Sequence, residues 1–335
     1  MRVTVLMGGT SSERDVSLAS GLRVAGALRE AGHVVRVVDT VRGGLSVEEE
    51  QAMLAGGRVV KTVPPDVQAL ARLNRQLPST LEQVGETDVI FLALHGGTGE
   101  DGTIQALLDL TGIPYTGSGH LASALAMDKD LSKHLFLRAG VPTAAWLMAP
   151  VTEARVEQAL GWPVVVKPSK QGSTVGLSLV RDPALLQSAI AEAFKHDDEV
   201  MVEAFVPGRE LTVGILGGEA LPVGEIIPVN ELYDYECKYT PGMAREIFPA
   251  DLSAEQTAEI QRLAKRAFEA LKLGGCARID FRMTSSGEFS CLEANTLPGM
   301  TELSLIPQAA AAAGLSFPAL CDRIVQIATL SRTSR

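Results

Sequence analysis

A lysine followed by a loop of small residues, in WPVVVKPSKQGSTVGLSLV at positions 162–180, could bind a phosphate group. An apolar run ends at Lys167, and a second apolar run begins after the loop. Backbone N–H groups in such a loop are unshielded and can donate to phosphate oxygens. In the GxxxxGK[ST] motif the lysine follows the glycines and a helix begins there, so this stretch is a different motif. It predicts a flap between two antiparallel strands, with an ordinary flexible hairpin as the alternative.

A cluster of acidic side chains is predicted in the sequence ARIDFRMTSSGEFSCLEAN. If residues 286–287 are the centre of a tight hairpin, Asp280 lies opposite Glu293 and Arg278 opposite Asn295, all on one face. The other face is apolar and consists of Ile279, Phe281, Met283, Leu292 and Ala294. Facing carboxylates repel each other unless a cation lies between them, and oxygen ligands suit Mg²⁺ or Mn²⁺. The alternative is a solvated face on which nearby arginines neutralise the acids.

The composition is that of a soluble globular protein and narrows the classes of partner. The chain has 335 residues, which is enough for two or three domains. Of these residues, 46% are hydrophobic and 21% are charged. The formal net charge of −10 argues against nucleic acid as a partner. The four cysteines form no CxxC pair, so neither zinc nor a disulfide framework is expected, and free thiols suit the cytoplasm. No apolar run approaches the roughly 20 residues of a membrane span, so no membrane partner is expected.

The apolar patterns predict an N-terminal α/β unit over residues 1–121. RVTVLM and HVVRVVD are buried strands, and VSLASGLRVAGALREAG between them has apolar residues at helical spacing. Strand, helix and strand joined by short loops indicate a parallel sheet. DVIFLAL adds a central strand and IPYTG a short one, whereas residues 41–87 are expected to form loops and short helices.

Two α+β units are predicted after this domain. Residues 122–206 are expected to begin with one helix over residues 123–140 and to contain the two strands that flank the flap. Residues 207–335 are expected to contain an antiparallel pair, a polar, aromatic loop at 231–248, a helix, the acidic hairpin and a final helix. IPQAAAAAG is expected to form a buried or half-buried helix.

Seven segments of the chain, in order and over nearly its whole length, resemble the D-alanine–D-alanine ligases, a family of ATP-grasp enzymes. They are GGTSSERDVSLASG, LHGGTGEDGTIQALLDLTGIPYTGSG, AMDK, VKPSKQGSTVG, YDYECKY, RIDF and LEANTLPGMT. The resemblance implies an ATP-grasp fold over about residues 133–327, preceded by a Rossmann-like parallel-sheet domain. It also implies that ATP phosphorylates the carboxylate of one D-alanine and that the amine of a second D-alanine displaces the phosphate. The product, D-alanyl-D-alanine, is a precursor of the peptidoglycan cell wall.

The resemblance implies roles for individual residues around ATP. The expected nucleotide-binding residues are Lys129 and Lys167 at the phosphates, Gly172, Ser173 and Thr174 in the covering loop, Glu203, Phe205 and Val206 at the nucleoside, Glu210 at the ribose and Lys238 at the γ-phosphate. The expected ligands of two Mg²⁺ ions, for which Mn²⁺ can substitute, are Asp280, Glu293 and Asn295. The metal set agrees with the facing carboxylates that the hairpin predicts.

The resemblance implies a second set of residues around the amino-acid substrates. They are Glu13 for the first ammonium group, Ser173 and Tyr239 as its hydrogen-bond partners, His95 beside the first substrate, Arg278 and the Gly299 N–H group for the oxyanion, and Ser304 and Leu305 for the second carboxylate. On the local pattern alone, Glu13 is equally well an acid favoured in the first turn of a helix. An isolated histidine such as His95 is more often structural.

Two other functions fit parts of the pattern. A ligase that joins D-alanine to D-lactate or D-serine would share the fold, and a nucleotide-binding module without chemistry would share the ATP site. If the protein were such a module, residues would be missing from the metal-binding face and from the lid, which is the loop at residues 231–248. The residues expected at both places are present. Ester-forming relatives are expected to carry a histidine in the lid, and residues 231–248 contain none, with Tyr239 at the key position. The resemblance further suggests a homodimer through the N-terminal domain, with small molecules as the other partners.

Overall fold

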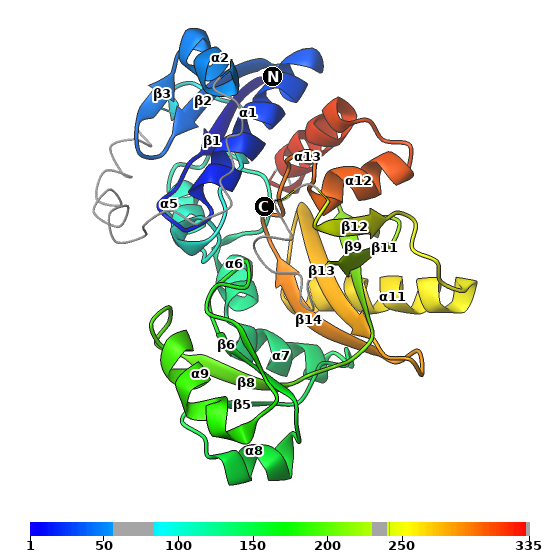
Figure 1. Ribbon diagram of the computed structural model, residues 1–335. Coiled ribbons are helices and arrows are strands. Elements are labelled where there is room, and N and C mark those ends of the chain that lie inside the picture. Colours follow the sequence, from blue (N-terminus) through cyan, green and yellow to red (C-terminus); the bar gives the residue numbers. More distant parts are fainter. Residues whose placement is uncertain (56–83, 230–239, 241, 333–335) are drawn as a thin grey trace.

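The described part of the chain forms three β-sheets that follow one another along the sequence (Figure 1). The computed structural model describes residues 1–55, 84–229, 240 and 242–332. Each sheet lies within one of the three predicted units, and the combination of α/β and α+β organisation is confirmed. The boundaries between the units remain predictions. Among the described residues, no helix is both long enough and apolar enough to cross a membrane.

The first sheet is four-stranded, in the order β3-β2-β1-β4, and its three main strands are parallel as predicted. Its elements are β1 (Arg2–Met7), α1 (Arg14–Glu30), β2 (Val34–Asp39), β3 (Gly43–Leu45), α2 (Val47–Ala55), β4 (Val89–Leu92), η3 (Gly97–Gly99) and α5 (Thr103–Asp109). β1 and β4 are nearly continuous apolar runs, as expected for parallel strands that are covered on both faces. The predicted strand IPYTG contributes a single bridge, from Tyr115 to Ile90. In the 41–87 segment, which was expected to form loops and short helices, α2 is such a helix but β3 is a strand that extends the sheet, and residues 56–83 lie outside the described residues.

The second sheet is four-stranded and antiparallel, in the order β5-β8-β6-β7. The elements of this unit are α6 (His120–Met127), α7 (Lys129–Arg138), β5 (Trp146–Met148), α8 (Glu153–Ala159), β6 (Val164–Pro168), β7 (Ser178–Val180), η4 (Pro183–Leu185), α9 (Leu186–Ala193) and β8 (Val200–Ala204). β6 and β7 are the predicted antiparallel strands on either side of the flap, which we define as residues 169–177.

The prediction of one helix over residues 123–140 was wrong, because the chain breaks at Asp128 between α6 and α7. Asp128 has extended backbone angles, φ −80° and ψ 101°, and its carboxylate accepts a hydrogen bond from the Leu131 N–H group at 2.9 Å. This N-cap contact satisfies one of the N–H groups that a helix start leaves without an intrahelical partner. Lys129 is therefore the first residue of α7 and not a residue in the middle of a helix.

The third sheet is six-stranded, in the order β12-β11-β9-β13-β14, with β10 paired to β9. The elements of this unit are β9 (Arg209–Leu216), β10 (Glu219–Ala220), β11 (Gly224–Pro228), β12 (Ala244–Ile247), α11 (Ala254–Ala270), β13 (Cys276–Met283), β14 (Phe289–Asn295), α12 (Leu305–Ala312) and α13 (Phe317–Arg332). The predicted final helix is thus two helices, and the predicted half-buried helix is α12. In the β13–β14 ladder, Asp280 pairs with Glu293 and Arg278 pairs with Asn295, as predicted.

Nearer its turn, the same hairpin differs from the prediction. The register shifts after the acidic pair, so that Phe281 pairs with Cys291, and Leu292 is the extra residue of a β-bulge. The turn is longer than the predicted two residues, since the Thr284 N–H group donates to the Glu288 carbonyl at 2.9 Å. Leu292 therefore leaves the predicted core face, and Cys291 is buried there instead.

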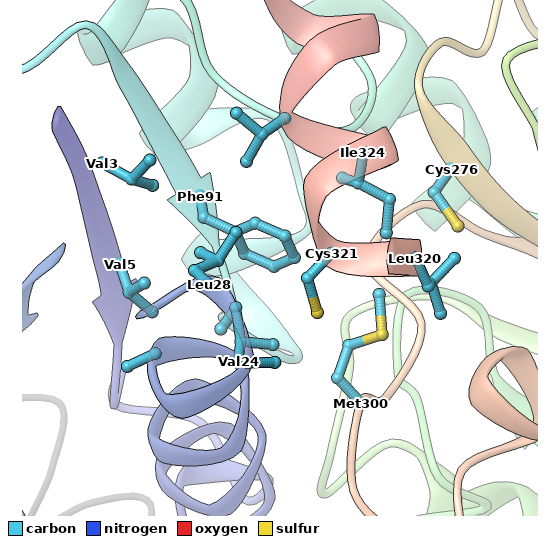
Figure 2. Packing of buried hydrophobic residues seen from close by; sticks show 14 of the residues in the cluster. Val3, Val5, Val24, Leu28, Phe91, Cys276, Met300, Leu320, Cys321 and Ile324 are labelled. Carbon is cyan, nitrogen blue, oxygen red and sulfur yellow. The ribbon is translucent and has the colours of Figure 1, made fainter. Parts of the chain in front are cut away.

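One hydrophobic core joins the first sheet to the last helix of the chain (Figure 2). Val24 and Leu28 of α1, Phe91 of β4 and Ile324 of α13 all belong to this cluster, and Figure 2 shows their side chains converging. α13 packs against both α1 and β4. The helix at the C-terminal end of the sequence therefore covers apolar surface of the domain at the N-terminal end.

Candidate active site

A cavity in which residues of the second and third sheets meet collects most of the predicted nucleotide-binding residues. The predicted residues in its lining are Lys129, Lys167, Ser173, Thr174, Glu203, Phe205, Val206, Glu210, Arg278, Asp280 and Glu293. The lining also contains residues that the sequence did not assign to a site, namely Val165, Pro168, Gln171, Val175, Leu177, Ala204, Ile226, Arg282 and Leu292. Apolar walls with a few converging charged groups are typical of a site for a cofactor.

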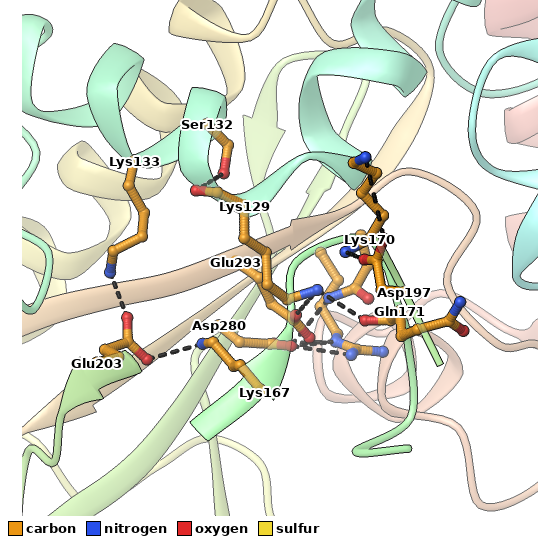
Figure 3. A network of polar contacts seen from close by, with 12 residues as sticks. Lys129, Ser132, Lys133, Lys167, Lys170, Gln171, Asp197, Glu203, Asp280 and Glu293 are labelled. Atoms are coloured by element: carbon orange, nitrogen blue, oxygen red, sulfur yellow. Dashed lines mark hydrogen bonds and ion pairs between the residues drawn. The ribbon is translucent and has the colours of Figure 1, made fainter. Parts of the chain in front are cut away.

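Glu203 is the centre of a buried ion-pair network beside this cavity (Figure 3). Its carboxylate accepts hydrogen bonds from Lys167 Nζ at 2.7 Å and from Lys133 Nζ. Burial alone would raise the pKa of Glu203, but the charges of the two lysines lower it below its ordinary value. Lys133 was not among the predicted site residues, because a lysine in a helix is usually exposed to solvent.

Lys129 connects the flap to the acidic hairpin (Figure 3). Its Nζ atom donates to the Gln171 carbonyl at 2.8 Å and lies 3.3 Å from Glu293 Oε2. Both lysines that the sequence places at the phosphates thus line one cavity, and each is ion-paired with a carboxylate. The break before α7 sets the position of Lys129, so this detail could not follow from a continuous helix.

The three predicted metal ligands lie together on the hairpin. Asn295 Nδ2 donates to Asp280 Oδ2 at 3.0 Å, and the Arg278 guanidinium donates to the same oxygen at 2.9 Å. Thr212 Oγ1 donates to Asp280 Oδ1 at 2.7 Å. Two facing carboxylates beside an amide fit a hard cation such as Mg²⁺. In the described part of the chain, no group of three or more His, Cys, Asp or Glu side chains could hold a metal. The predicted set instead combines two carboxylates with the amide of Asn295.

Arg282 organises the predicted nucleoside end of the cavity. Its Nη1 atom donates to Glu210 Oε2 at 3.2 Å, and its Nε atom donates to the Val206 carbonyl at 3.1 Å. The guanidinium carbon lies 5.6 Å from the ring centre of Phe205. Arg282 was not among the predicted site residues, yet it contacts three of them.

A second cavity shares two lining residues with the first and collects the residues predicted for the amino-acid substrates. It is lined by Glu13, Val16, His95, Glu100, Gly172, Ser173, Arg278, Asn295, Leu297, Pro298, Gly299, Leu303, Ser304 and Leu305. Ser173 and Arg278 line both cavities. The predicted residues Lys238 and Tyr239 lie outside the described residues.

Glu13 is buried just before α1 and contacts the flap. The Ser173 hydroxyl donates to Glu13 Oε1. A Cβ atom on Gly96 or on Gly172 would lie 2.9 Å from Glu13 Oε2, so the two glycines allow loops from different units to close around this carboxylate. Ser173 adopts a φ of 52°, which is unfavourable for a residue with a side chain and is concentrated at functional sites.

His95 lines the second cavity and connects the first domain to the loop that follows Leu297. Its Nδ1 atom lies 2.9 Å from the Leu297 carbonyl, which can only accept, so Nδ1 carries the proton. Its Nε2 atom lies 3.1 Å from Ser20 Oγ, which accepts a hydrogen bond from the Met300 N–H group at 3.2 Å. Burial lowers the pKa of His95, so the ring is neutral. The histidine thus both lines the cavity and holds the loop that follows Leu297.

Glu100 also lines this cavity, although it was not among the predicted residues. Its Oε2 atom accepts a hydrogen bond from the Gly96 N–H group at 2.8 Å. Burial, together with the nearby charge of Glu13, raises the pKa of Glu100 to about 8. The side chain therefore retains its proton near neutral pH. Its place in HGGTGEDG, directly after a buried strand, is the signal that could have revealed it.

Gly299 and Ser304 both line this cavity, and they approach each other closely. A Cβ atom on Gly299 would lie 2.6 Å from Ser304 Oγ, so only glycine fits without a shift. Ser304 Oγ accepts a hydrogen bond from the Thr301 N–H group at 2.9 Å. Ser304 directly precedes Leu305, the first residue of α12. Gly299 and Ser304 therefore lie in one compact loop directly before α12, whereas Arg278, the other predicted oxyanion residue, lies on β13.

Two α+β units that form one charged cavity, with a flap beside it, define an ATP-grasp enzyme. Two family models match the chain, "D-ala D-ala ligase N-terminus" over residues 2–118 and "D-ala D-ala ligase C-terminus" over residues 135–326. The chain belongs to the D-alanine–D-alanine ligase family.

Similar proteins cover nearly the whole chain. The D-alanine–D-alanine ligase of Citrifermentans bemidjiense is 44% identical over 98% of this chain and 96% of its own length. That of Syntrophotalea carbinolica is 41% identical over 99% of this chain and 97% of its own length. The D-alanine–D-alanine ligase of Bacillus anthracis, solved in complex with ATP, superposes with a TM-score of 0.79 at 31% identity, covering 100% of this chain and 98% of that one.

Proposed function

We propose that the protein joins two molecules of D-alanine into D-alanyl-D-alanine for peptidoglycan synthesis, converting ATP to ADP and phosphate. The observation that carries the proposal is the pair of cavities that share Ser173 and Arg278. One is lined by lysines and acids, and the other contains a buried carboxylate that suits a substrate ammonium group. This arrangement suits a reaction between the terminal phosphate of a nucleotide and the carboxylate of an amino acid.

The reaction consists of two substitutions. A carboxylate oxygen of the first D-alanine attacks the γ-phosphorus of ATP, the bond from phosphorus to the bridging oxygen breaks, and ADP leaves. The neutral amine of the second D-alanine then attacks the acyl carbon, the bond from that carbon to the phosphate oxygen breaks, and the nitrogen loses a proton. Negative charge develops on oxygen in both steps, so the protein must mainly position the reactants and neutralise charge.

At the nucleotide, Lys129 and Lys167 would neutralise phosphate oxygens while the flap covers them. Asp280, Glu293 and Asn295 would hold Mg²⁺, which neutralises phosphate charge when bound. Glu203 and Glu210 would accept hydrogen bonds from the base and the ribose, with Phe205 and Val206 beside the base. Gly172 and Thr174 belong to the covering loop. Lys238 at the γ-phosphate remains a prediction from the family resemblance.

At the amino acids, Glu13 would accept the ammonium group of the first D-alanine, with Ser173 fixing the carboxylate. Arg278 and the Gly299 N–H group would stabilise the oxyanion of the tetrahedral intermediate, a contribution that is commonly large. Ser304 and Leu305 would bind the carboxylate of the second D-alanine. His95 would border the first substrate, and the contact of Tyr239 with Ser173 remains a prediction from the resemblance.

A competition assay tests the choice of acceptor. The protein is incubated with ATP, Mg²⁺, D-alanine and an excess of D-lactate or D-serine, and the products are identified by mass spectrometry. We expect D-alanyl-D-alanine to dominate from mildly acidic to neutral pH, because the predicted lid contains no histidine that could repel an ammonium group. A dominant D-alanyl-D-lactate or D-alanyl-D-serine peak near neutral pH would assign the protein to that alternative instead.

We also propose that the enzyme works in the cytoplasm as a homodimer. Three of its cysteines, Cys276, Cys291 and Cys321, are free and buried, which suits a reducing compartment. The dimer rests on the family resemblance alone. Light scattering during gel filtration tests it, and a mass equal to one chain at micromolar concentration would contradict it.

A further inference from the structure

Lys133 is a fully buried lysine to which the proposed reaction assigns no role. It lies in α7, outside the lining of both cavities, and its side chain has a relative exposure of 0%. Its Nζ atom donates to Glu203 Oε1 and, at 2.6 Å, to Thr143 Oγ1. The ring centre of Trp146 lies 5.0 Å from the same nitrogen. A buried ammonium group is costly unless it is paired, so this position requires a reason.

The two oxygens of Glu203 have different surroundings. Oε1 contacts Lys133, which is away from the cavity, whereas Oε2 contacts Lys167, which lines it. Figure 3 shows the carboxylate between these two lysines, with one contact to each. If Lys167 turns to a phosphate group, Oε2 loses its partner and becomes an acceptor on the cavity side, while Oε1 remains held.

Lys133 is itself fixed to the acidic hairpin. The Thr143 hydroxyl that accepts from Lys133 donates its own proton to the Cys291 carbonyl at 2.7 Å. Cys291 directly precedes the bulge residue Leu292, which lines the nucleotide cavity. Lys133 therefore links the Glu203 carboxylate to the strand that carries Glu293.

We propose that Lys133 is a positioning residue for nucleobase selection, which holds one oxygen of Glu203 so that the other accepts a hydrogen bond from the amino group of adenine. The inference rests on the proposed ATP-dependent function. A base with a carbonyl oxygen in place of that amino group, as in ITP, cannot donate this hydrogen bond. It would instead bring two acceptors together, which sites built around a hydrogen bond reject strongly.

Calorimetric titration of ATP and ITP against the protein with Mg²⁺, without D-alanine, tests this role. We expect the wild-type protein to bind ATP at least about tenfold more tightly than ITP, as a hydrogen bond to a charged group requires. In Lys133→Met the ratio should fall to about threefold or less, with most of the loss on ATP. Glu203→Gln should also reduce the ratio, and the double variant should reduce it no further. Lys265→Met is the matched control and should keep the wild-type ratio, because Lys265 is a partly exposed lysine paired with Glu219 and lines neither cavity.

If a folded Lys133→Met protein keeps the wild-type ratio of ATP affinity to ITP affinity, the proposal is overturned, whether or not both affinities fall. A purely structural lysine would have that effect. A wild-type protein that does not distinguish the two nucleotides overturns it as well. If Lys133→Met does not fold, Thr143→Val removes one partner of Nζ and keeps the charge; it should reduce the ratio about threefold, and an unchanged ratio contradicts the role. Selective ATP binding without dipeptide formation would refute the proposed function and leave this inference standing.

Discussion

Glu100 should make the stability of the protein depend on pH. Burial and the charge of Glu13 raise its pKa from 4.5 to about 8. The folded state therefore keeps a proton that the unfolded chain releases above pH 4.5, so the contribution is fully present below that pH and is lost as pH rises toward 8. We predict that, relative to Glu100→Gln, the wild-type protein loses stability between pH 5 and pH 8.

Thermal unfolding at pH 5, 6.5 and 8 measures this difference. Glu269→Gln, on an exposed part of α11, is the control and should follow the wild-type profile. Parallel profiles for the wild-type protein and Glu100→Gln would show that Glu100 does not titrate in this range.

Glu293 is the residue on which the proposed metal site depends most. Glu293→Gln removes a charged oxygen ligand and keeps the shape of the side chain, so we predict a loss of at least about 100-fold in ADP formation with an intact fold. Glu288→Gln, an exposed acid near the turn of the same hairpin, should retain the wild-type rate. Near-normal turnover of Glu293→Gln at saturating Mg²⁺ would refute the assignment of Glu293 as a metal ligand.

The residues of the site differ in how far their roles can be predicted from the neighbouring sequence alone. Asp280 and Glu293 were predicted to pair because strand alternation and a nearby turn are local properties of the sequence. Leu292 was misplaced because a β-bulge depends on the neighbouring strands and leaves no mark in the apolar pattern. Lys133 and Glu100 were missed because their meaning comes from burial, which is decided by other parts of the chain.

The flap is the element whose motion should accompany nucleotide binding. Its Lys170 N–H group donates to Asp197 Oδ2 at 2.5 Å, and Gln171 Nε2 donates to the His196 carbonyl at 2.9 Å. Ser173 and Thr174, farther along, have φ angles of 52° and 60°, which cost free energy in residues with side chains. We predict that ATP with Mg²⁺ slows hydrogen exchange at residues 170–176, because contacts with phosphate compensate this strain.

Hydrogen exchange with mass spectrometry on the same sample provides the control. The turn at residues 284–288 lines neither cavity, so its exchange should not change. Equal exchange of residues 170–176 with and without nucleotide would favour the ordinary hairpin that was the alternative interpretation of this sequence.

The helices and strands were predicted better than their interruptions. The strands on either side of the flap follow from apolar runs that end at a proline and at small residues. The break at Asp128 was not predicted, because alanine and leucine before it and lysine and leucine after it favour one continuous helix. Asp128 competes with that preference through its cap contact, and the break places Lys129 at the cavity.

At the scale of the whole molecule, the shared core should make the first domain depend on the last helix. Ile324 of α13 is 2% exposed within this core, whereas Leu330 on the same helix is 65% exposed. We predict that Ile324→Ala lowers the free energy of unfolding by about 2–5 kcal/mol, as deletion of a buried side chain usually does. Leu330→Ala should change it by less than about 0.5 kcal/mol.

Urea unfolding measures both variants, and hydrogen exchange locates the effect. Ile324→Ala should reduce protection in β1 and β4, which are more than 200 residues away in the sequence. Loss of protection confined to α13 would mean that the helix is only attached to the domain and does not stabilise it.

The position of α13 has a consequence for synthesis on the ribosome. Translation extends the chain by roughly 5 to 20 residues per second, and N-terminal domains commonly fold while it continues. About 200 residues separate the end of the first domain from Ile324, so the apolar surface of α1 and β4 remains exposed for roughly 10 to 40 s until α13 has been synthesised. During that interval the nascent protein exposes a partly finished core, which is the kind of surface that chaperones bind.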